Sequence, residues 1–395
     1  MKLGSDVFPV SWEPKTKTYR IEAGLIHGVD NGSIFEVYES DAIESKLLFT
    51  LTARTVHPLS TISTINEAKA KLPRMLPVAR QIRCGNPLKV YFTSAFLAVV
   101  CQNKVLHLHN IHRKLEVVDD AARADFIIDI ESETKAVFTT NLKAMTDNGF
   151  RRFPKSVPAN PKNVHRVLLA ASRWKQHLEV SCDSPLAKSI EIEFFRLETS
   201  HYDMGLVTKP MGKALNLRND LVYIDVRPNN MDYYGMKIQN NTATDLHFLM
   251  LAFDIGDLDI SKSNRLPCYF LSSLGSLSAS IVSGAVGVQS TGGADPNLYA
   301  MKFLPIGYGN GGETPLGFKY PGGKVNVTIL KMYFTTHPMD LKWLEQATPF
   351  TVLPGDPQDE RGLSTREEIW RALNASNPTV FTKSFTIVQR AHLSC

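Results

Sequence analysis

The sequence predicts a mainly β protein of the α+β class, with a small β and α+β region followed by an antiparallel β-sandwich carrying one amphipathic helix. Short β-branched and aromatic runs recur along the 395 residues between turns that contain Asn and Gly, which is typical of a sandwich. Residues 190–194 alternate apolar and polar side chains, as a sheet with one face in water does. Residues 164–178 have the clearest helical spacing.

We expect residues 1–65 to form a small β-barrel-like unit. Residues 19–38 have the composition of a strand, a turn and a second strand, with the turn at Asp30-Asn31-Gly32. Residues 47–53 supply a further strand of the same kind.

A small α+β unit is expected over residues 66–160. A short helical turn is predicted within residues 119–125, and three prolines between residues 154 and 161 mark the end of the unit. The predicted strands lie at residues 88–92, 104–109 and 126–130.

Residues 161–350 are expected to contain the helix and the sandwich. The helix places its apolar side chains on one face, namely Val164, Val167, Leu168, Ala171, Trp174 and Leu178. The predicted strands lie at residues 190–197, 221–226, 235–239, 246–253, 299–304 and 325–335. Residues 271–293, rich in Ser and Gly, are expected to form a long loop.

The last residues, 351–395, are expected to form a tail. Ser364-Thr365-Arg366-Glu367 has the pattern of a capping box and predicts a short helix that runs to Leu373.

The composition is that of an ordinary globular protein, with 43% hydrophobic and 21% charged residues. The net charge of +5 is spread along the chain, which argues against a nucleic-acid partner. No apolar run reaches the length of a membrane span, and residues 1–6 lack a signal core. We therefore predict a cytoplasmic protein with no membrane partner. The five scattered cysteines, expected as reduced and mostly buried thiols, are Cys84, Cys101, Cys182, Cys268 and Cys395.

The glycine-rich segment at residues 307–314 fits a dinucleotide fingerprint and nearly fits a phosphate-binding loop. Both motifs require a helix directly after the glycines. Here Pro315 and a strand-like run at residues 325–334 follow instead, and Glu313 stands where the phosphate-binding lysine would be. The segment is therefore predicted to connect strands, with no nucleotide bound.

Three further groups of residues have the composition of candidate sites. His107, His109 and His112 form a histidine cluster without a Cys or Asp to complete a metal site. A calcium ion could be bound by the clustered Asp254, Asp257 and Asp259, but their spacing is not that of an EF-hand. We expect them to be acidic residues of a turn or of the surface. A solvated basic face is expected for Arg74, Arg80 and Arg83. We predict no catalytic, cofactor-binding or metal-binding residue and no cofactor.

Several segments together resemble a known family. They are residues 22–29, 234–240, 245–248, 253–260, 304–312 and 329–341. The amino-acid sequences of these segments are similar to those of the region downstream of the caspase domain in fungal caspase-like proteins of peptidase family C14. The resemblance runs discontinuously from about residue 19 to residue 350.

The family's catalytic motifs are not matched. His27-Gly28 has no acidic-Cys partner pattern, and Cys182 is followed by Asp183 instead of being preceded by an acid. The resemblance therefore implies a non-catalytic interaction or regulatory module, with a caspase-like catalytic domain as the implied protein partner. Two alternatives stay open: part of a C14-type cysteine peptidase whose catalytic domain is missing from this chain, and a β-sandwich that binds a carbohydrate ligand.

Overall fold

The computed structural model describes most of the chain and groups it into two compact units. One unit comprises Met1–Asp147, Arg151–Cys182 and Thr348–Leu373, and the other comprises Asn148–Phe150, Asp183–Ala347 and Asn374–Cys395. The described residues are 7–42, 45–65, 77–101, 114–202, 205–215, 217, 220–226, 232–262, 296–309, 315–318, 325–339, 341–351 and 378–391.

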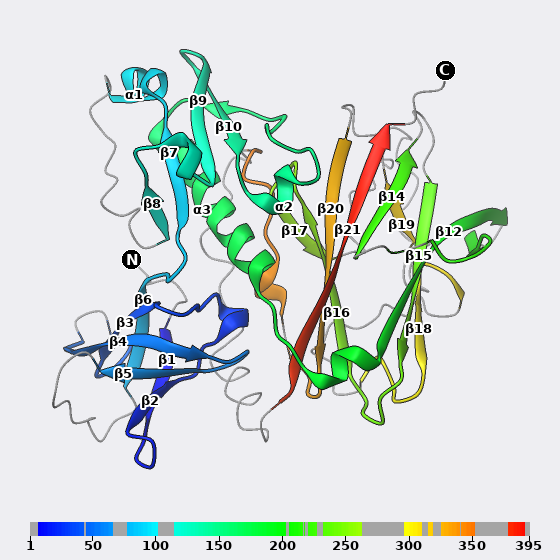
Figure 1. Ribbon diagram of the computed structural model, residues 1–395, viewed down its shortest axis with the longest axis horizontal. Helices are drawn as coiled ribbons and strands as arrows, with labels where there is room; N and C mark the ends of the chain where they lie inside the picture. The colour runs from blue at the N-terminus through cyan, green and yellow to red at the C-terminus, as the bar shows by residue number, and fades with distance from the viewer. Residues whose placement is uncertain are drawn as a thin grey trace. The chain divides into compact units, whose positions relative to one another are not determined.

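The first unit begins with a closed antiparallel barrel in the order β1-β2-β5-β4-β3-β6 (Figure 1). Alternate side chains of its strands point inward, so that Val10, Ile21, Phe35 and Leu51 are buried in one core. The sixth strand, β6, lies beyond residue 65, where the predicted barrel-like unit ends. It pairs with β1 and β3 and so closes the barrel. The strands are β1 (Val7–Glu13), β2 (Thr18–Ile21), β3 (Ile34–Tyr38), β4 (Leu47–Val56), β5 (Thr61–Ile65) and β6 (Val78–Arg83), with the 3₁₀ turn η1 (Leu25–His27) after β2.

A five-stranded mixed sheet completes this unit, in the order β11-β10-β9-β7-β8. The pairs β7–β8 and β7–β9 are parallel, and the other two pairs are antiparallel. Its elements are β7 (Leu88–Phe92), α1 (Ser94–Cys101), β8 (Leu115–Val117), η3 (Ala121–Arg123), β9 (Phe126–Ser132), β10 (Lys135–Thr140), α2 (Lys143–Thr146) and β11 (Val157–Pro158).

Helix α3 (Pro161–Glu179) packs against this sheet and contacts β7, β8 and β11. It starts where Asn160 accepts a hydrogen bond from the backbone N–H of Asn163 at 3.0 Å, and Pro161 occupies the first turn. Of the face predicted from the sequence, five residues are buried and Leu178 is half-buried; the buried ones are Val164, Val167, Leu168, Ala171 and Trp174. The helix is therefore fixed by both its cap and its apolar face.

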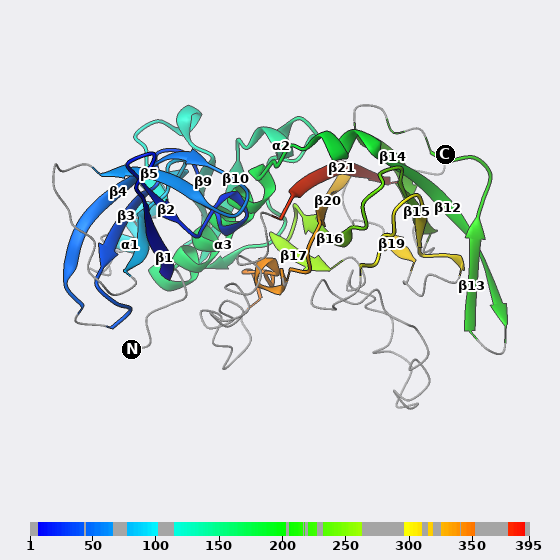
Figure 2. The ribbon, with the colours of Figure 1, turned by 90° about the horizontal axis from the view of Figure 1, so that it is seen from below.

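The second unit is a β-sandwich (Figures 1 and 2). One sheet has the order β13-β12-β15-β18, with β19 also paired to β15, and the other has the order β14-β21-β20-β16-β17. Their facing side chains, among them Phe194, Met236, Met250 and Phe334, form one core. The elements are η4 (Pro185–Ser189), β12 (Ile190–Tyr202), β13 (Gly205–Pro210), β14 (Leu221–Val226), β15 (Asp232–Asn240), β16 (His247–Asp254), β17 (Asp259–Lys262), β18 (Phe303–Ile306), β19 (Leu316–Phe318), β20 (Val325–Thr335), η7 (Lys342–Leu344) and β21 (Val380–Ala391).

The predicted mainly β, α+β fold is confirmed. The strands predicted at 88–92, 221–226 and 325–335 have the bounds of β7, β14 and β20. The strand predicted at 299–304 corresponds to β18, which begins four residues later, at Phe303. The sequence predicted an antiparallel sandwich, but β14 and β21 pair in parallel. Among the described helices, none is long and apolar enough to cross a membrane.

Strand β21 was not predicted, since it lies in the segment expected to form a tail. It pairs with β14 on one side and β20 on the other. Three predicted features lie outside the described residues: the strand at 104–109, the loop at 271–293 and the helix at 364–373.

Candidate functional site

The first described part of the glycine-rich segment, Gly307 to Gly309, leaves β18 and folds over the sheet at Gly235. A Cβ added at Gly235 would lie 2.6 Å from the carbonyl oxygen of Ile306 and 2.9 Å from the Tyr308 ring. Gly307 has a φ of +82°, which glycine adopts without strain. The Thr208 hydroxyl donates to the Gly307 carbonyl at 2.5 Å. In the described part, β18 precedes the segment and β19 follows it, as expected of a strand connector.

Aromatic and charged side chains lie together on the outer face of this sheet. The Tyr308 ring contacts the Phe195 ring edge to face, with centroids 6.1 Å apart. Burial, and secondarily the negative charge of Glu193, raise the pKa of Tyr308. Lys237 forms an ion pair with Glu193 at 3.0 Å, and its ammonium lies 5.5 Å from the centre of the Phe303 ring.

Three large apolar side chains next to this face are exposed. Tyr299 is 52% exposed, Met301 65% and Phe303 55%. We call these three residues the apolar turn. The three lie within five residues of one another in the sequence, so exposed apolar side chains are concentrated in one short segment.

The apolar turn is held by the fully buried Asn240. The Asn240 amide donates to the carbonyls of Thr244, Leu298 and Tyr299 at 2.9, 3.3 and 3.2 Å. Asp245 caps the turn by accepting from the Ala300 N–H at 2.7 Å. These bonds fix the backbone beneath the exposed side chains, so little conformational entropy is lost when a partner binds.

The outer edge of β18 is a poor template for another strand. Among the described strands, β18 pairs with β15 only. The Asn240 N–H donates to the Lys302 carbonyl at 2.9 Å, and hydrogen-bonded pairs alternate along an antiparallel ladder. Phe303 and Pro305 therefore direct their backbone groups away from β15. Since proline has no N–H, Pro305 interrupts that edge, and a partner would contact side chains instead.

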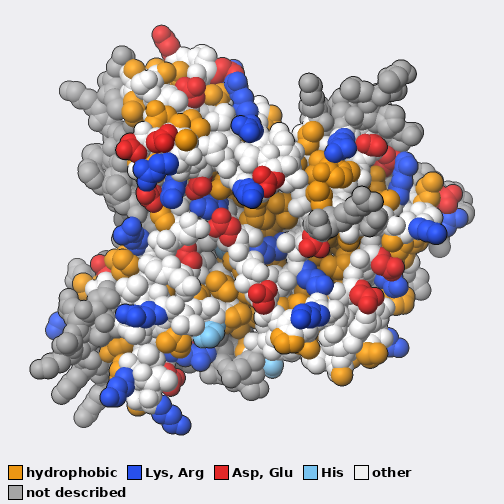
Figure 3. Space-filling view, viewed as in Figure 1, with side chains coloured by type: hydrophobic (Ala, Val, Ile, Leu, Met, Phe, Trp, Pro, Cys, Tyr) orange, Lys and Arg blue, Asp and Glu red, His pale blue; other side chains and the backbone are white. Residues whose placement is uncertain are grey.

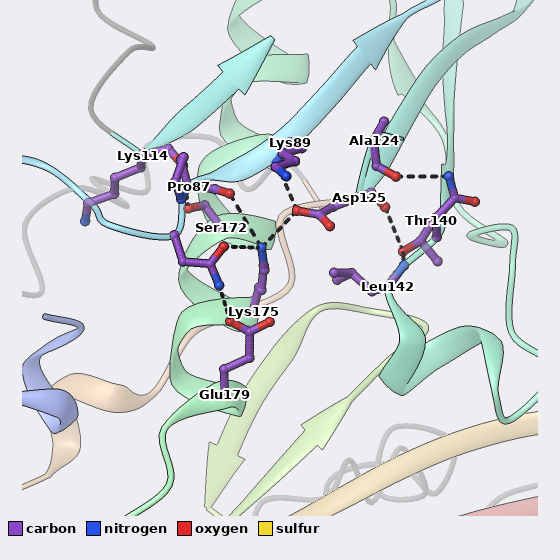
Figure 4. A network of polar contacts seen from close by, with 12 residues as sticks. Pro87, Lys89, Lys114, Ala124, Asp125, Thr140, Leu142, Ser172, Lys175 and Glu179 are labelled. Atoms are coloured by element: carbon purple, nitrogen blue, oxygen red, sulfur yellow. Dashed lines mark hydrogen bonds and ion pairs between the residues drawn. The ribbon is translucent and has the colours of Figure 1, made fainter. Parts of the chain in front are cut away.

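A second polar centre is buried in the first unit, where α3 meets the mixed sheet (Figure 4). The Lys175 ammonium contacts the Asp125 carboxylate at 2.9 Å, the Asn86 side-chain oxygen at 3.3 Å and the Pro87 carbonyl at 3.5 Å. Asp125 also accepts from the Lys89 N–H at 2.9 Å. Three acceptors therefore surround the ammonium, one for each of its hydrogens, and Lys175 ties α3 to the residues that flank β7.

The three aspartates considered as a calcium site, Asp254, Asp257 and Asp259, come together at the β16–β17 hairpin. Asp254 and Asp259 are register partners, and the Asp254 carboxylate accepts from the Asp257 N–H at 3.0 Å. Burial, then the charges of Asp254, Asp257 and Glu345, raise the pKa of Asp259 to about 6 against an opposing hydrogen bond from Ser261. Within the described residues, no group of His, Cys, Asp or Glu side chains has the arrangement of a metal site.

His27-Gly28 caps the barrel. The His27 Nδ1 accepts from the Gly24 N–H at 3.1 Å, and burial lowers the pKa of His27 to about 4. A Cβ at Gly28 would lie 2.6 Å from the Gln176 side chain of α3. The motif therefore joins the barrel to α3. The His-Gly pattern alone did not predict this role, because the contact is with a residue far away in the sequence.

The remaining predicted residues do not assemble into a site in the described part of the chain. Cys84 and Cys182 are buried, and the Cys84 sulfur accepts from the side-chain amides of Gln81 and Gln176 at 3.8 and 3.7 Å. Arg80 donates to the carbonyls of Asp41 and Ala42, both at 3.2 Å, while Arg83 is exposed. Outside the description lie His107, His109, His112, Arg74, Cys268, Cys395 and the Cys101 side chain.

Comparison with protein-family models, with curated proteins and with solved structures finds no match for this chain.

Proposed function

We propose that this chain is a non-catalytic interaction and regulatory module that binds a protein partner through the apolar turn. The observation that carries the proposal is the exposure of Tyr299, Met301 and Phe303 on a backbone held by Asn240. Tyr, Phe and Met are enriched at the centres of protein interfaces. The partner that the sequence resemblance suggests is a caspase-like catalytic domain.

The distribution of charge supports a protein partner over a nucleic acid. On the face drawn in Figure 3, Lys and Arg side chains are interspersed with Asp and Glu side chains. Nucleic-acid binding favours a concentrated basic face instead. We propose a cytoplasmic location with this function, where cysteines such as Cys84 and Cys182 would be kept reduced.

The alternative of a C14-type cysteine peptidase requires a reactive thiolate within reach of a histidine. Cys84 is 4% exposed and Cys182 2%, and buried structural thiols are inert. These two thiols are therefore poor candidates for a nucleophile, and in the C14-type alternative the nucleophile would belong to the catalytic domain that is missing from this chain.

The experiment combines an activity assay with a footprint of the complex. The chain is incubated with a peptide substrate of caspase-like proteins, alone and with a caspase-like catalytic domain, and hydrogen exchange of the mixture is compared with that of the free chain. We expect no activity from the chain alone and slower exchange at residues 296–306 in the mixture. Activity of the chain alone that disappears with a Cys→Ala variant, or unchanged exchange at residues 296–306, would overturn the proposal.

A further inference from the structure

Strand β14 is an outer strand of the second sandwich sheet, and among the described strands it pairs with β21 only (Figure 1). The Asp220 carbonyl, directly before β14, accepts from the Thr386 N–H of β21 at 2.7 Å. Because alternate residues of a strand bond to the same neighbour, the even-numbered residues of β14 direct their backbone groups towards β21. The odd-numbered residues direct theirs away from β21, and these residues are Leu221, Tyr223 and Asp225.

Three other described outer strands of the sandwich carry features that hinder pairing. Strand β18 contains Pro305, and β13 ends in Lys209 and Pro210. The outer side of β17 is already occupied, since Ile260 and Gln346 exchange two backbone hydrogen bonds of 2.9 and 2.8 Å. Proteins block open strand edges with proline, lysine or a covering segment, whereas the six residues of β14 contain neither proline nor lysine. The β14 edge is therefore suited to pairing with a further strand.

The exposed side chains at this edge combine an aromatic ring with two opposite charges. Tyr223 is 50% exposed, and the Arg390 guanidinium lies 3.9 Å from the centre of its ring. Asp225 is exposed and is the register partner of Arg390 on β21. The cation–π contact restricts the Tyr223 ring before any partner binds, so less conformational entropy is lost on binding.

We propose that β14 pairs antiparallel with β14 of a second copy of this chain, about a two-fold axis at Tyr223, so that the sheets of the two copies form one continuous sheet. Tyr223 then lies opposite Tyr223 of the second copy, and Leu221 lies opposite Asp225 of the second copy on each side of the axis. The outward residues of both strands exchange backbone hydrogen bonds, about six in total. A two-fold axis pairs both open edges at once with the same strand, and it is the commonest symmetry of homo-oligomers.

Side-chain pairing and charge favour a second copy in this register. Aromatic side chains directly opposite each other stabilise antiparallel strands, whereas like charges opposite each other destabilise them. With the axis at Tyr223, no carboxylate faces another, and each Asp225 keeps Arg390 of its own copy beside it. An axis at Asp225 would instead place two carboxylates opposite each other and leave Leu221 without a partner residue. The strand is therefore complementary to itself in the register centred on Tyr223.

Sedimentation equilibrium of the full chain tests the proposal. Between about 1 and 200 μM, the concentrations at which weak interfaces associate, we expect the mass to rise from the 44.0 kDa of one chain towards twice that value. Leu221→Asp places a carboxylate opposite Asp225 of the second copy at two symmetric positions. It should raise the dissociation constant Kd of the dimer roughly fivefold, the combined effect of two cross-strand pairs. Leu221→Lys places an opposite charge at the same positions and should lower Kd roughly fivefold.

The matched controls are Met211→Asp and Met211→Lys, at a position 52% exposed elsewhere on the same unit, and neither should change Kd. Circular dichroism of each variant establishes that the sandwich is folded. Hydrogen exchange gives a second readout, since the outward amides of Tyr223 and Asp225 should exchange more slowly at the higher concentration. The mass of a single chain at every concentration would overturn the proposal, as would Kd shifts in the same direction for Leu221→Asp and Leu221→Lys.

Discussion

Gly235 shows how one residue decides the shape of the surface around it. The glycine-rich segment crosses directly over its Cα, and Tyr308 and the Ile306 carbonyl occupy the space of a side chain. The sequence identified this segment as a strand connector from Pro315 and the strand-like run after it. It did not identify Gly235 as the position on which the connector rests, because that contact joins residues about 70 apart in the sequence and has no local pattern.

Gly235→Ala should therefore destabilise the sandwich. The added methyl group forces the connector or β15 to move, which typically costs about 1–3 kcal/mol of unfolding free energy. Urea unfolding followed by tryptophan fluorescence measures the change. Gly256→Ala is the control, because the nearest atom to its added Cβ would lie at 3.4 Å and its cost should be about 1 kcal/mol or less. An equal effect of the two substitutions would contradict this account of Gly235.

At the scale of single elements, local pattern predicted α3 and β20 well and β21 not at all. Helix α3 has a cap, an N-terminal proline and one apolar face, all visible within its own sequence. In β21, adjacent residues such as Val388 and Gln389 are both buried, so the strand lacks a clean alternation of apolar and polar side chains. Its position between β14 and β20 depends on residues distant in sequence, which a local pattern cannot contain.

The attachment of α3 through Lys175 gives a prediction for that element. Lys175→Met leaves the half-buried Asp125 carboxylate without its cation, and this should cost about 3 kcal/mol, the lower end of the range for breaking a fully buried pair. Adding Asp125→Asn should recover part of that loss, since no unpaired carboxylate then remains at this site. Thermal or urea unfolding of both single variants and of the double variant measures the coupling.

The comparison for this pair is Arg123→Ala, which breaks an exposed ion pair with Asp119 and should cost less than about 1 kcal/mol. Additive effects of Lys175→Met and Asp125→Asn would show that the ion pair does not hold the helix.

At the scale of the whole molecule, the sandwich is assembled from both ends of a long stretch of chain. Strand β21, at residues 380–391, lies between β14 and β20, and its Phe381, Phe385 and Ile387 belong to the core. The sequence predicted the two-sheet architecture from the alternation of its strands. It did not predict that the last part of the chain returns to complete the second sheet.

A chain that ends after residue 377 should therefore lose the folded sandwich, because β14 loses its described neighbour and three large apolar side chains leave the core. Near-ultraviolet circular dichroism and the unfolding transition of the truncated chain measure this. Retention of the full-length transition would show that β21 is dispensable.

The central claim is that the apolar turn binds a protein partner, and the dissociation constant for a caspase-like catalytic domain tests it most directly. Truncating central interface side chains typically costs more than about 1 kcal/mol each, so Met301→Ser combined with Phe303→Ser should raise Kd at least about tenfold. Met211→Ser, at a position 52% exposed elsewhere on the same unit, should leave Kd unchanged. Equal Kd values for the wild-type chain and the double variant would contradict the claim.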